Sequence, residues 1–93
     1  MSTQITLEHN PAPIKLEVMA VETWPVWEKE VSTFDWTYDQ DETCYILAGE
    51  VIVTPTSGGD PVSLQAKDLV TFPKGLSCQW DIKSPIKKHY KFG

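Results

Sequence analysis

The stretch FDWTYDQDETCYILAG, residues Phe34–Gly49, contains the pattern that decides the fold. Its first part, Phe34–Tyr38, alternates aromatic with polar residues, which is typical of a β-strand with one buried face. The polar turn Asp39–Asp41 follows, and Glu42–Ala48 then forms a second apolar-rich run that Gly49 ends. We therefore predict two consecutive strands that are joined by an acidic turn.

The chain from Val31 onward has the same all-β character. The predicted strands cover residues 33–38, 43–48, 50–54, 61–65, 69–72, 77–83 and 86–92. Gly58 and Gly59 supply the positive φ angles that a hairpin turn needs, and Pro73–Gly75 forms a second tight turn. Many short strands separated by Gly and Pro turns predict a sandwich or barrel.

The first 20 residues are less regular, and so is the tryptophan-rich segment that follows them. Gln4–Glu8 alternate as in a strand. A short helix is predicted over Ile14–Met19, with Pro13 at its first position, although the same residues also fit a strand. Pro25 prevents a central strand through Trp24–Trp27. That segment is predicted to be irregular and to cover a barrel end or contact another subunit.

The composition describes one small domain over residues 1–93, with 41% hydrophobic residues and a net charge of −5. The absence of Arg and the acidic balance argue against a nucleic-acid partner. No apolar run is long enough to span a membrane. The first ten residues lack the basic and apolar segments of a signal peptide. A cytoplasmic protein is expected, and an organelle stays open if a transit peptide has been removed.

Four of the eight lysines lie in the last strand region, at Lys83, Lys87, Lys88 and Lys91. Outward lysines commonly protect the edge of a β-sheet from pairing with another chain. We interpret all four in this way, with an anion site as the alternative.

Two short motifs carry a resemblance to a known family. Glu42 and Gly49 are separated by six residues, and Pro73–Ser77 leads directly to Cys78. In these residues the chain resembles small single-domain cupins of the (S)-ureidoglycine aminohydrolase cupin-domain group, within the RmlC-like cupin superfamily. The similarity extends over residues 20–92 and includes Trp24–Glu30, Phe34–Trp36, Glu42–Tyr45, Phe72–Leu76 and Lys87–Tyr90. It implies a cupin-type (RmlC-like jelly-roll) β-barrel of two antiparallel sheets and a homodimer.

The resemblance fails at the metal ligands. A cupin metal site usually combines three His with one Glu. The three His positions are occupied here by Trp36, Tyr38 and Cys78, and only Glu42 remains. No cofactor is therefore predicted, with a metal held by Glu42 and Cys78 as an alternative. The metal-dependent activity of ureidoglycine aminohydrolase is accordingly not transferred to this chain.

The inward positions define a predicted ligand pocket for a small planar or apolar molecule. Its residues are Trp36, Tyr38, Glu42, Cys44, Phe72, Cys78 and Trp80. Glu42 is the candidate catalytic acid or base, and alternatively caps the pocket through a hydrogen bond. Cys44 and Cys78 are interpreted as small buried apolar residues. The alternative is that one of them is a thiolate nucleophile, for which His89 is the only candidate base.

Three functions follow from this pocket. The domain is a metal-free small-molecule-binding protein, an enzyme with a metal-independent or atypical metal site, or a homodimeric scaffold with a filled barrel.

Overall fold

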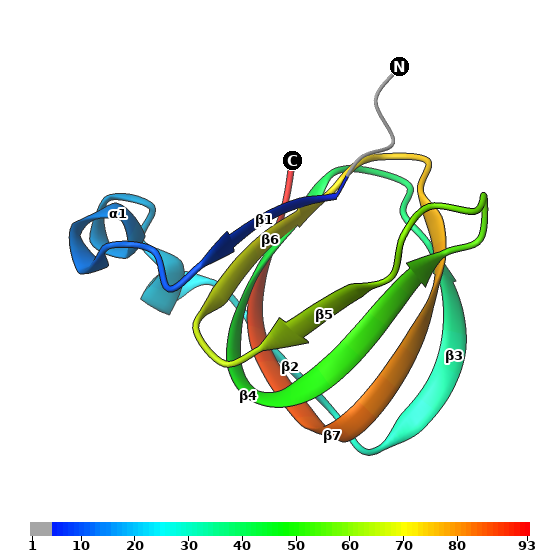
Figure 1. Ribbon diagram of the computed structural model, residues 1–93. Helices are drawn as coiled ribbons and strands as arrows, with labels where there is room; N and C mark the ends of the chain where they lie inside the picture. The colour runs from blue at the N-terminus through cyan, green and yellow to red at the C-terminus, as the bar shows by residue number, and fades with distance from the viewer. Residues whose placement is uncertain (1–4) are drawn as a thin grey trace.

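The computed structural model describes residues 5–93 as an antiparallel β-fold with one short helical arm (Figure 1). Its elements are β1 (Thr6–His9), α1 (Pro13–Val18), the 3₁₀ helix η1 (Val21–Thr23), β2 (Val26–Lys29), β3 (Ser32–Thr37), β4 (Glu42–Pro55), β5 (Val62–Gln65), β6 (Asp68–Phe72) and β7 (Ser77–Phe92). Every described strand pair is antiparallel. The predicted all-β class is confirmed.

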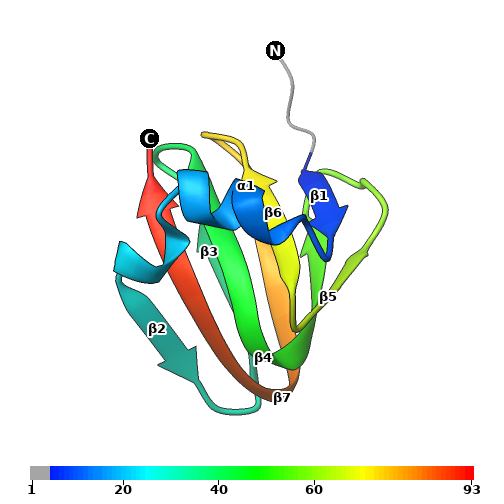
Figure 2. The same cartoon turned by 90° about the vertical axis from the view of Figure 1, so that its left-hand side faces the viewer.

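The two longest strands, β4 and β7, hold the molecule together because each belongs to both layers of the fold. In one layer the order is β1-β6-β4-β7-β2. In the other layer the second half of β4 pairs with β5, and the first half of β7 pairs with β3. Figures 1 and 2 show both strands curving from one layer into the other. The core lies between these layers, as the predicted two-sheet barrel requires.

The sequence pattern divided each long strand into two, whereas the structure has one continuous strand in each case. Residues 43–48 and 50–54 both belong to β4, and residues 77–83 and 86–92 both belong to β7. The pairing of β4 with β7 shifts register between Ile46 and Val51. Gly49 lies in this irregular region with a φ of 96°. A bulge of this kind bends a strand without ending it, so the turn-like sequence marks a bend.

The N-terminal elements run along the edge and the outer side of the first layer. The predicted helix is confirmed, and it ends at Val18, one residue before the expected end. β1 pairs with β6, where His9 Nδ1 lies 2.7 Å from Asp68 Oδ1. Gln4 of the predicted first strand lies outside the described residues.

The prediction of an irregular segment at residues 24–27 is wrong from Val26 onward, because β2 begins there. β2 is the edge strand beside β7, and Pro25 immediately precedes it. Proline is compatible with such a position because an edge strand needs hydrogen bonds on one side only. Trp24 is buried, and Trp27 packs edge-on against Trp80 at 6.1 Å between ring centroids.

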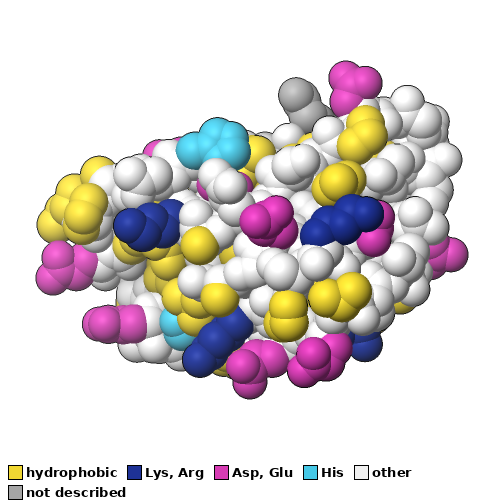
Figure 3. All heavy atoms as spheres, turned by 60° about the horizontal axis from the view of Figure 1, so that its bottom comes forward, with side chains coloured by type: hydrophobic (Ala, Val, Ile, Leu, Met, Phe, Trp, Pro, Cys, Tyr) yellow, Lys and Arg dark blue, Asp and Glu magenta, His cyan; other side chains and the backbone are white. Residues whose placement is uncertain are grey.

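The helical arm carries apolar side chains that the barrel does not cover. Ile14 is 64% exposed and Val18 is 80% exposed, and no residue of α1 is buried. Figure 3 shows hydrophobic side chains at the left end of the molecule, where α1 extends away from the sheets. Within residues 5–93, no helix has the length and apolar content needed to cross a membrane.

Replacement of Gly49 by Ala tests the bend in β4. A Cβ atom there would lie 2.2 Å from the carbonyl oxygen of Pro85, and φ is +96°. We expect G49A to lower the free energy of unfolding by about 2–4 kcal/mol, since it combines backbone strain with a steric clash. The measurement is urea denaturation followed by tryptophan fluorescence.

Gly58 provides the matched control. Its φ is +100°, but a Cβ atom there would have nothing within 4 Å. The G58A variant should therefore lose only about 1 kcal/mol, from backbone strain alone. Equal losses in the two variants would show that the close approach to Pro85 does not constrain the fold.

Candidate functional site

A cavity of about 180 Å³ lies between the two layers. Seven of its nine lining residues are aromatic, and the other two are a carboxylate and an ammonium group of opposite charge. The lining comprises Trp27, Phe34, Trp36, Tyr38, Glu42, Trp80, Lys88, Tyr90 and Phe92. Trp36 and Phe92 are 49% and 45% exposed, so they form the mouth of the cavity. The barrel is therefore not filled solid by its aromatic side chains.

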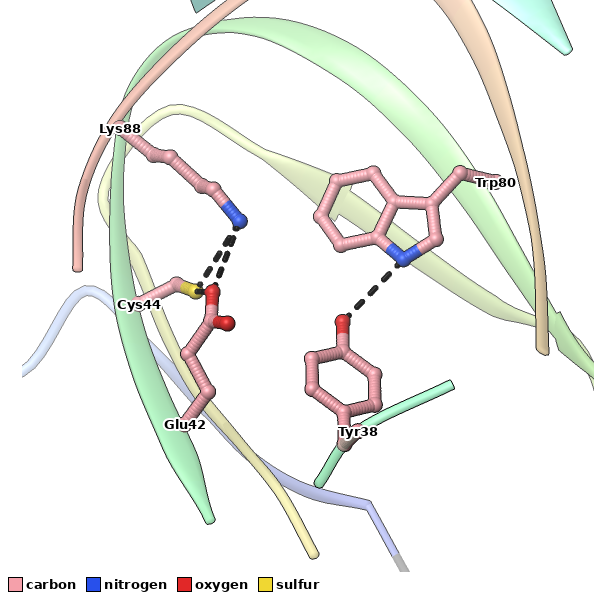
Figure 4. Close-up of polar contacts among 5 residues, drawn as sticks. All are labelled: Tyr38, Glu42, Cys44, Trp80 and Lys88. Atoms are coloured by element: carbon pink, nitrogen blue, oxygen red, sulfur yellow. Dashed lines mark hydrogen bonds and ion pairs between the residues drawn. The ribbon is translucent and has the colours of Figure 1, made fainter. Parts of the chain in front are cut away.

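The buried charges belong to Glu42 and Lys88. The side chains are 6% and 7% exposed, and Lys88 Nζ donates a hydrogen bond of 3.1 Å to Glu42 Oε2. Glu42 is the first residue of β4, and Lys88 lies opposite Ile46 on β7. The lysine side chain extends along the strands past Cys44 to reach the carboxylate (Figure 4). The prediction that the four lysines of the last strand protect a sheet edge is thus wrong, because β7 is an internal strand. Lys83, Lys87 and Lys91 are exposed, whereas Lys88 faces the core.

Two tryptophan rings and a thiol complete the surroundings of the ammonium group. Lys88 Nζ lies 4.8 Å from the ring centroid of Trp27 and 4.6 Å from that of Trp80. It also lies 3.4 Å from Cys44 Sγ, which donates to Glu42 Oε2 at 3.1 Å. The negative faces of indole rings attract cations. The ammonium group is therefore stabilised by an anion, two rings and a sulfur atom.

A second polar contact lies across the cavity, between Tyr38 and Trp80. Trp80 Nε1 donates to the Tyr38 hydroxyl oxygen at 3.2 Å, as Figure 4 shows. Burial raises the pKa of Tyr38, and the nearby acidic groups Cys44, Cys78 and Glu42 raise it further. Tyr38 therefore remains a neutral phenol with a hydrogen atom to donate. Its ring stacks on Phe72 at 4.8 Å between centroids, which fixes its orientation.

The seven residues predicted to form the pocket occupy three kinds of position. Trp36, Tyr38, Glu42 and Trp80 line the cavity. Cys44 contacts the ion pair from the side, while Phe72 and Cys78 are fully buried in the surrounding core.

The structure separates His89 from both cysteines. Its Nδ1 atom donates to the backbone carbonyl of Trp24 at 2.9 Å, whereas the cysteines face the interior. Burial raises the pKa of Cys44 to about 12 and that of Cys78 to about 11. Both thiols are therefore protonated at neutral pH, and His89 does not activate either one.

Sequence reasoning missed Lys88 and four aromatic lining residues, namely Trp27, Phe34, Tyr90 and Phe92. The available signal was the alternation along the last strand, since residues 86, 88, 90 and 92 share one face. Ile86 and Tyr90 mark that face as apolar, which places Lys88 inside. A lysine whose neighbours on the same strand face are apolar indicates a buried ammonium group with a partner, because an ammonium group is buried only when another group compensates its charge.

The part of the chain that the structure describes lacks a cluster of the usual metal ligands. Among residues 5–93, no group of three or more His, Cys, Asp or Glu side chains is placed to hold a metal ion. At the floor of the cavity, the ammonium group of Lys88 provides a positive charge beside Glu42.

The antiparallel two-layer barrel and its interior site define a small cupin. A family model described as the EutQ-like cupin domain matches residues 16–90, and the chain belongs to this family. The cupin assignment made from the sequence is confirmed at this level.

Several solved structures are similar to the chain. The crystal structure of a DUF861 family protein from Thermotoga maritima is 51% identical, has a TM-score of 0.93, and matches 97% of this chain and 100% of its own. The EutQ protein of Clostridium difficile is 28% identical, with a TM-score of 0.65 over 72% of this chain and 52% of its own. A putative ethanolamine utilization protein Q from Salmonella typhimurium is 25% identical, with a TM-score of 0.64 over 72% of this chain and 53% of its own. The chain thus spans about half the length of those two proteins. No curated protein matches the chain.

Removal of one partner of the buried ion pair should be more harmful than removal of both. Lys88→Met leaves the Glu42 carboxylate buried without its cation, and we expect a loss of about 3–5 kcal/mol in the free energy of unfolding. The double variant Glu42→Leu/Lys88→Met should recover much of this loss, because neither charge is then buried. Chemical denaturation of the wild type, both single variants and the double variant measures the coupling. Additive losses would contradict a direct interaction between the two side chains.

The buried thiols predict a loss of stability at alkaline pH. Their folded-state pKa values of about 12 and 11 lie above the ordinary value of 9.0. Above pH 9 the unfolded chain therefore releases protons that the folded protein retains, so the free energy of unfolding falls as pH rises. Urea denaturation at several values between pH 8 and pH 11 measures this slope.

The cysteine-free variant Cys44→Ala/Cys78→Ala supplies the comparison. It starts from lower stability because it loses buried volume, but its stability should decline less steeply above pH 9. An equal slope in the two proteins would show that the thiols do not cause the decline.

Proposed function

We propose that this domain binds a small, planar organic molecule in its aromatic cavity without the help of a metal ion. The observation that carries the proposal is the placement of two opposite charges on the wall of a cavity that opens to solvent. A domain that served only as a scaffold would be more stable with apolar residues at both positions, since burial of charges is costly. The ion pair is better explained by a ligand that uses it.

The size of the cavity suits a molecule with a single ring. Its volume of about 180 Å³ is slightly larger than the cavity of about 150 Å³ that accepts benzene in an engineered protein. Seven aromatic side chains offer their faces and edges to such a ring. Aromatic pairs prefer stacked or edge-to-face arrangements, so the walls favour a flat ligand.

The polar atoms define the group that the ligand should carry. The Lys88 ammonium group and the Tyr38 hydroxyl group supply donors. Glu42 Oε2 is used by Lys88 and Cys44, whereas Oε1 has no hydrogen-bond partner among the described side chains and backbone groups. A planar amide matches this pattern, because its carbonyl oxygen accepts and its N–H donates. We therefore favour a small amide or lactam with an apolar ring.

We also propose that the chain is related in sequence to the (S)-ureidoglycine aminohydrolase cupin-domain group. Glu42, Gly49 and Pro73–Ser77 support it. It contributes no activity, because Trp36, Tyr38 and Cys78 occupy the positions of the family's metal-binding histidines.

A binding experiment tests the proposal. Single-ring amides such as benzamide should quench or shift tryptophan fluorescence in a saturable manner, since three of the four tryptophans line the cavity. We expect dissociation constants on the order of micromolar to millimolar, as is usual for ligands of this size. Glu42→Gln and Tyr38→Phe should each weaken binding about tenfold, because each removes one hydrogen-bonding group. Prior treatment with EDTA should not change the affinity.

Lys87→Met is the matched control, since Lys87 is exposed next to Lys88 on the same strand. Its affinity should equal that of the wild type. Absence of saturable binding across a set of amides, lactams and related carbonyl compounds would overturn the proposal. An equal loss of affinity in the Lys87→Met control would also overturn it.

A further inference from the structure

The ion pair places a primary amine, a carboxylate and an apolar cavity together. Lys88 Nζ is within 3.1 Å of Glu42 Oε2, and both residues line the cavity. A lysine in an apolar pocket is a known type of nucleophile toward carbonyl compounds. We propose that Lys88 condenses with small aldehydes or ketones to form an imine, with Glu42 as the proton carrier. This inference rests on the proposed function, since the carbonyl compound would occupy the same cavity.

The first requirement is a neutral amine. Transfer of one proton from Lys88 Nζ to Glu42 Oε2 converts two buried charges into two neutral groups. The hydrogen bond between the two atoms already provides the path for the proton. The neutral amine then has a lone pair with which to attack a carbonyl carbon.

The reaction balances with the groups that are present. The amine nitrogen bonds to the carbonyl carbon, the C=O double bond becomes a C–O single bond, and one proton moves from the nitrogen to that oxygen to give a carbinolamine. The Glu42 carboxylic acid then protonates the hydroxyl group, which leaves as water while the C=N bond forms. Overall, the ammonium and R–CHO give R–CH=NH⁺–Lys88 and one water, and Glu42 returns to its carboxylate form. No oxidant or reductant is required.

The product retains the electrostatic environment of the starting lysine. The iminium nitrogen bears the positive charge that the ammonium bore, so Glu42 still neutralises it. The rings of Trp27 and Trp80, now 4.8 Å and 4.6 Å from Nζ, still present their negative faces to it. The site thus accommodates the cation before and after the reaction, so formation of the imine does not require a new charge to be buried.

Cys44 does not compete for the carbonyl compound. Its side chain is completely buried and does not line the cavity. Its thiol donates to Glu42 and stays protonated at neutral pH, because burial raises its pKa to about 12. Lys88 is therefore the one nucleophile among the described residues that line the cavity and lie beside a proton carrier.

Reductive trapping of the protein tests the inference. Benzaldehyde and sodium cyanoborohydride convert an imine into a secondary amine, which adds the mass of the aldehyde less one oxygen atom. Peptide mapping by mass spectrometry then locates the adduct. We expect Lys88 to be labelled at least about tenfold faster than the exposed Lys87, since positioned acid–base catalysis contributes rate factors of this size or more. Comparison within the wild-type protein does not depend on whether a variant folds.

Two variants sharpen the result. Glu42→Gln should reduce labelling at Lys88 by about a hundredfold and leave Lys87 unchanged, because the amide cannot carry the proton. Lys88→Arg keeps the positive charge and should abolish the fast adduct. Labelling of Lys88 no faster than Lys87 would overturn the inference.

A parallel titration with benzamide separates this failure from a failure of the proposed function. Benzamide has a similar shape but does not form an imine under these conditions. If benzamide binds and Lys88 is not labelled preferentially, the imine inference is wrong and the binding function stands. If neither benzamide nor the other amides, lactams and carbonyl compounds bind and Lys88 is not labelled, both are wrong.

Discussion

The pairing of β4 with β7 is the constraint on which the rest of this structure depends. Each strand serves both layers, so one set of hydrogen bonds fixes the curvature of the barrel and the relative positions of its interior side chains. The shift in register near Gly49 allows both strands to bend together, and the close approach of Pro85 leaves no space for a larger residue there. Glu42 and Lys88 meet because they lie on the same face of these two paired strands. The cavity is therefore a product of the strand register.

The ion pair has a cost that the surroundings partly offset. Charges removed from water lose hydration energy, and their mutual attraction does not always restore it. Here the ammonium group also faces two indole rings, and the carboxylate accepts a hydrogen bond from Cys44. A pair of apolar residues would fill the same space at a lower cost in free energy. The arrangement is consequently better suited to selecting a bound molecule than to stabilising the fold.

The sequence predicted the fold more completely than the site, and particular residues show why. Alternation in Phe34–Tyr38 and the turns at Gly58 and Pro73 were enough to predict an antiparallel β-fold, because these are local signals. The continuity of β4 through Gly49 could not be predicted from local signals, because it depends on how β7 bends beside it. Lys88 was misplaced because a charged residue was assumed to face water, although its neighbours at alternate positions face the core. The volume of the cavity depends on how seven aromatic rings pack, which no sequence pattern specifies.

The lysine inside the barrel also determines how the site is assembled. A metal centre must be loaded after the chain is synthesised, and the ion that it acquires depends on what the surroundings supply. The amino group of Lys88 is attached to β7 by covalent bonds, so it arrives with the polypeptide and is not exchanged for another group. Folding alone brings it to Glu42. Every correctly folded copy of the domain therefore carries the same amino group at the same place, whatever metal ions surround it.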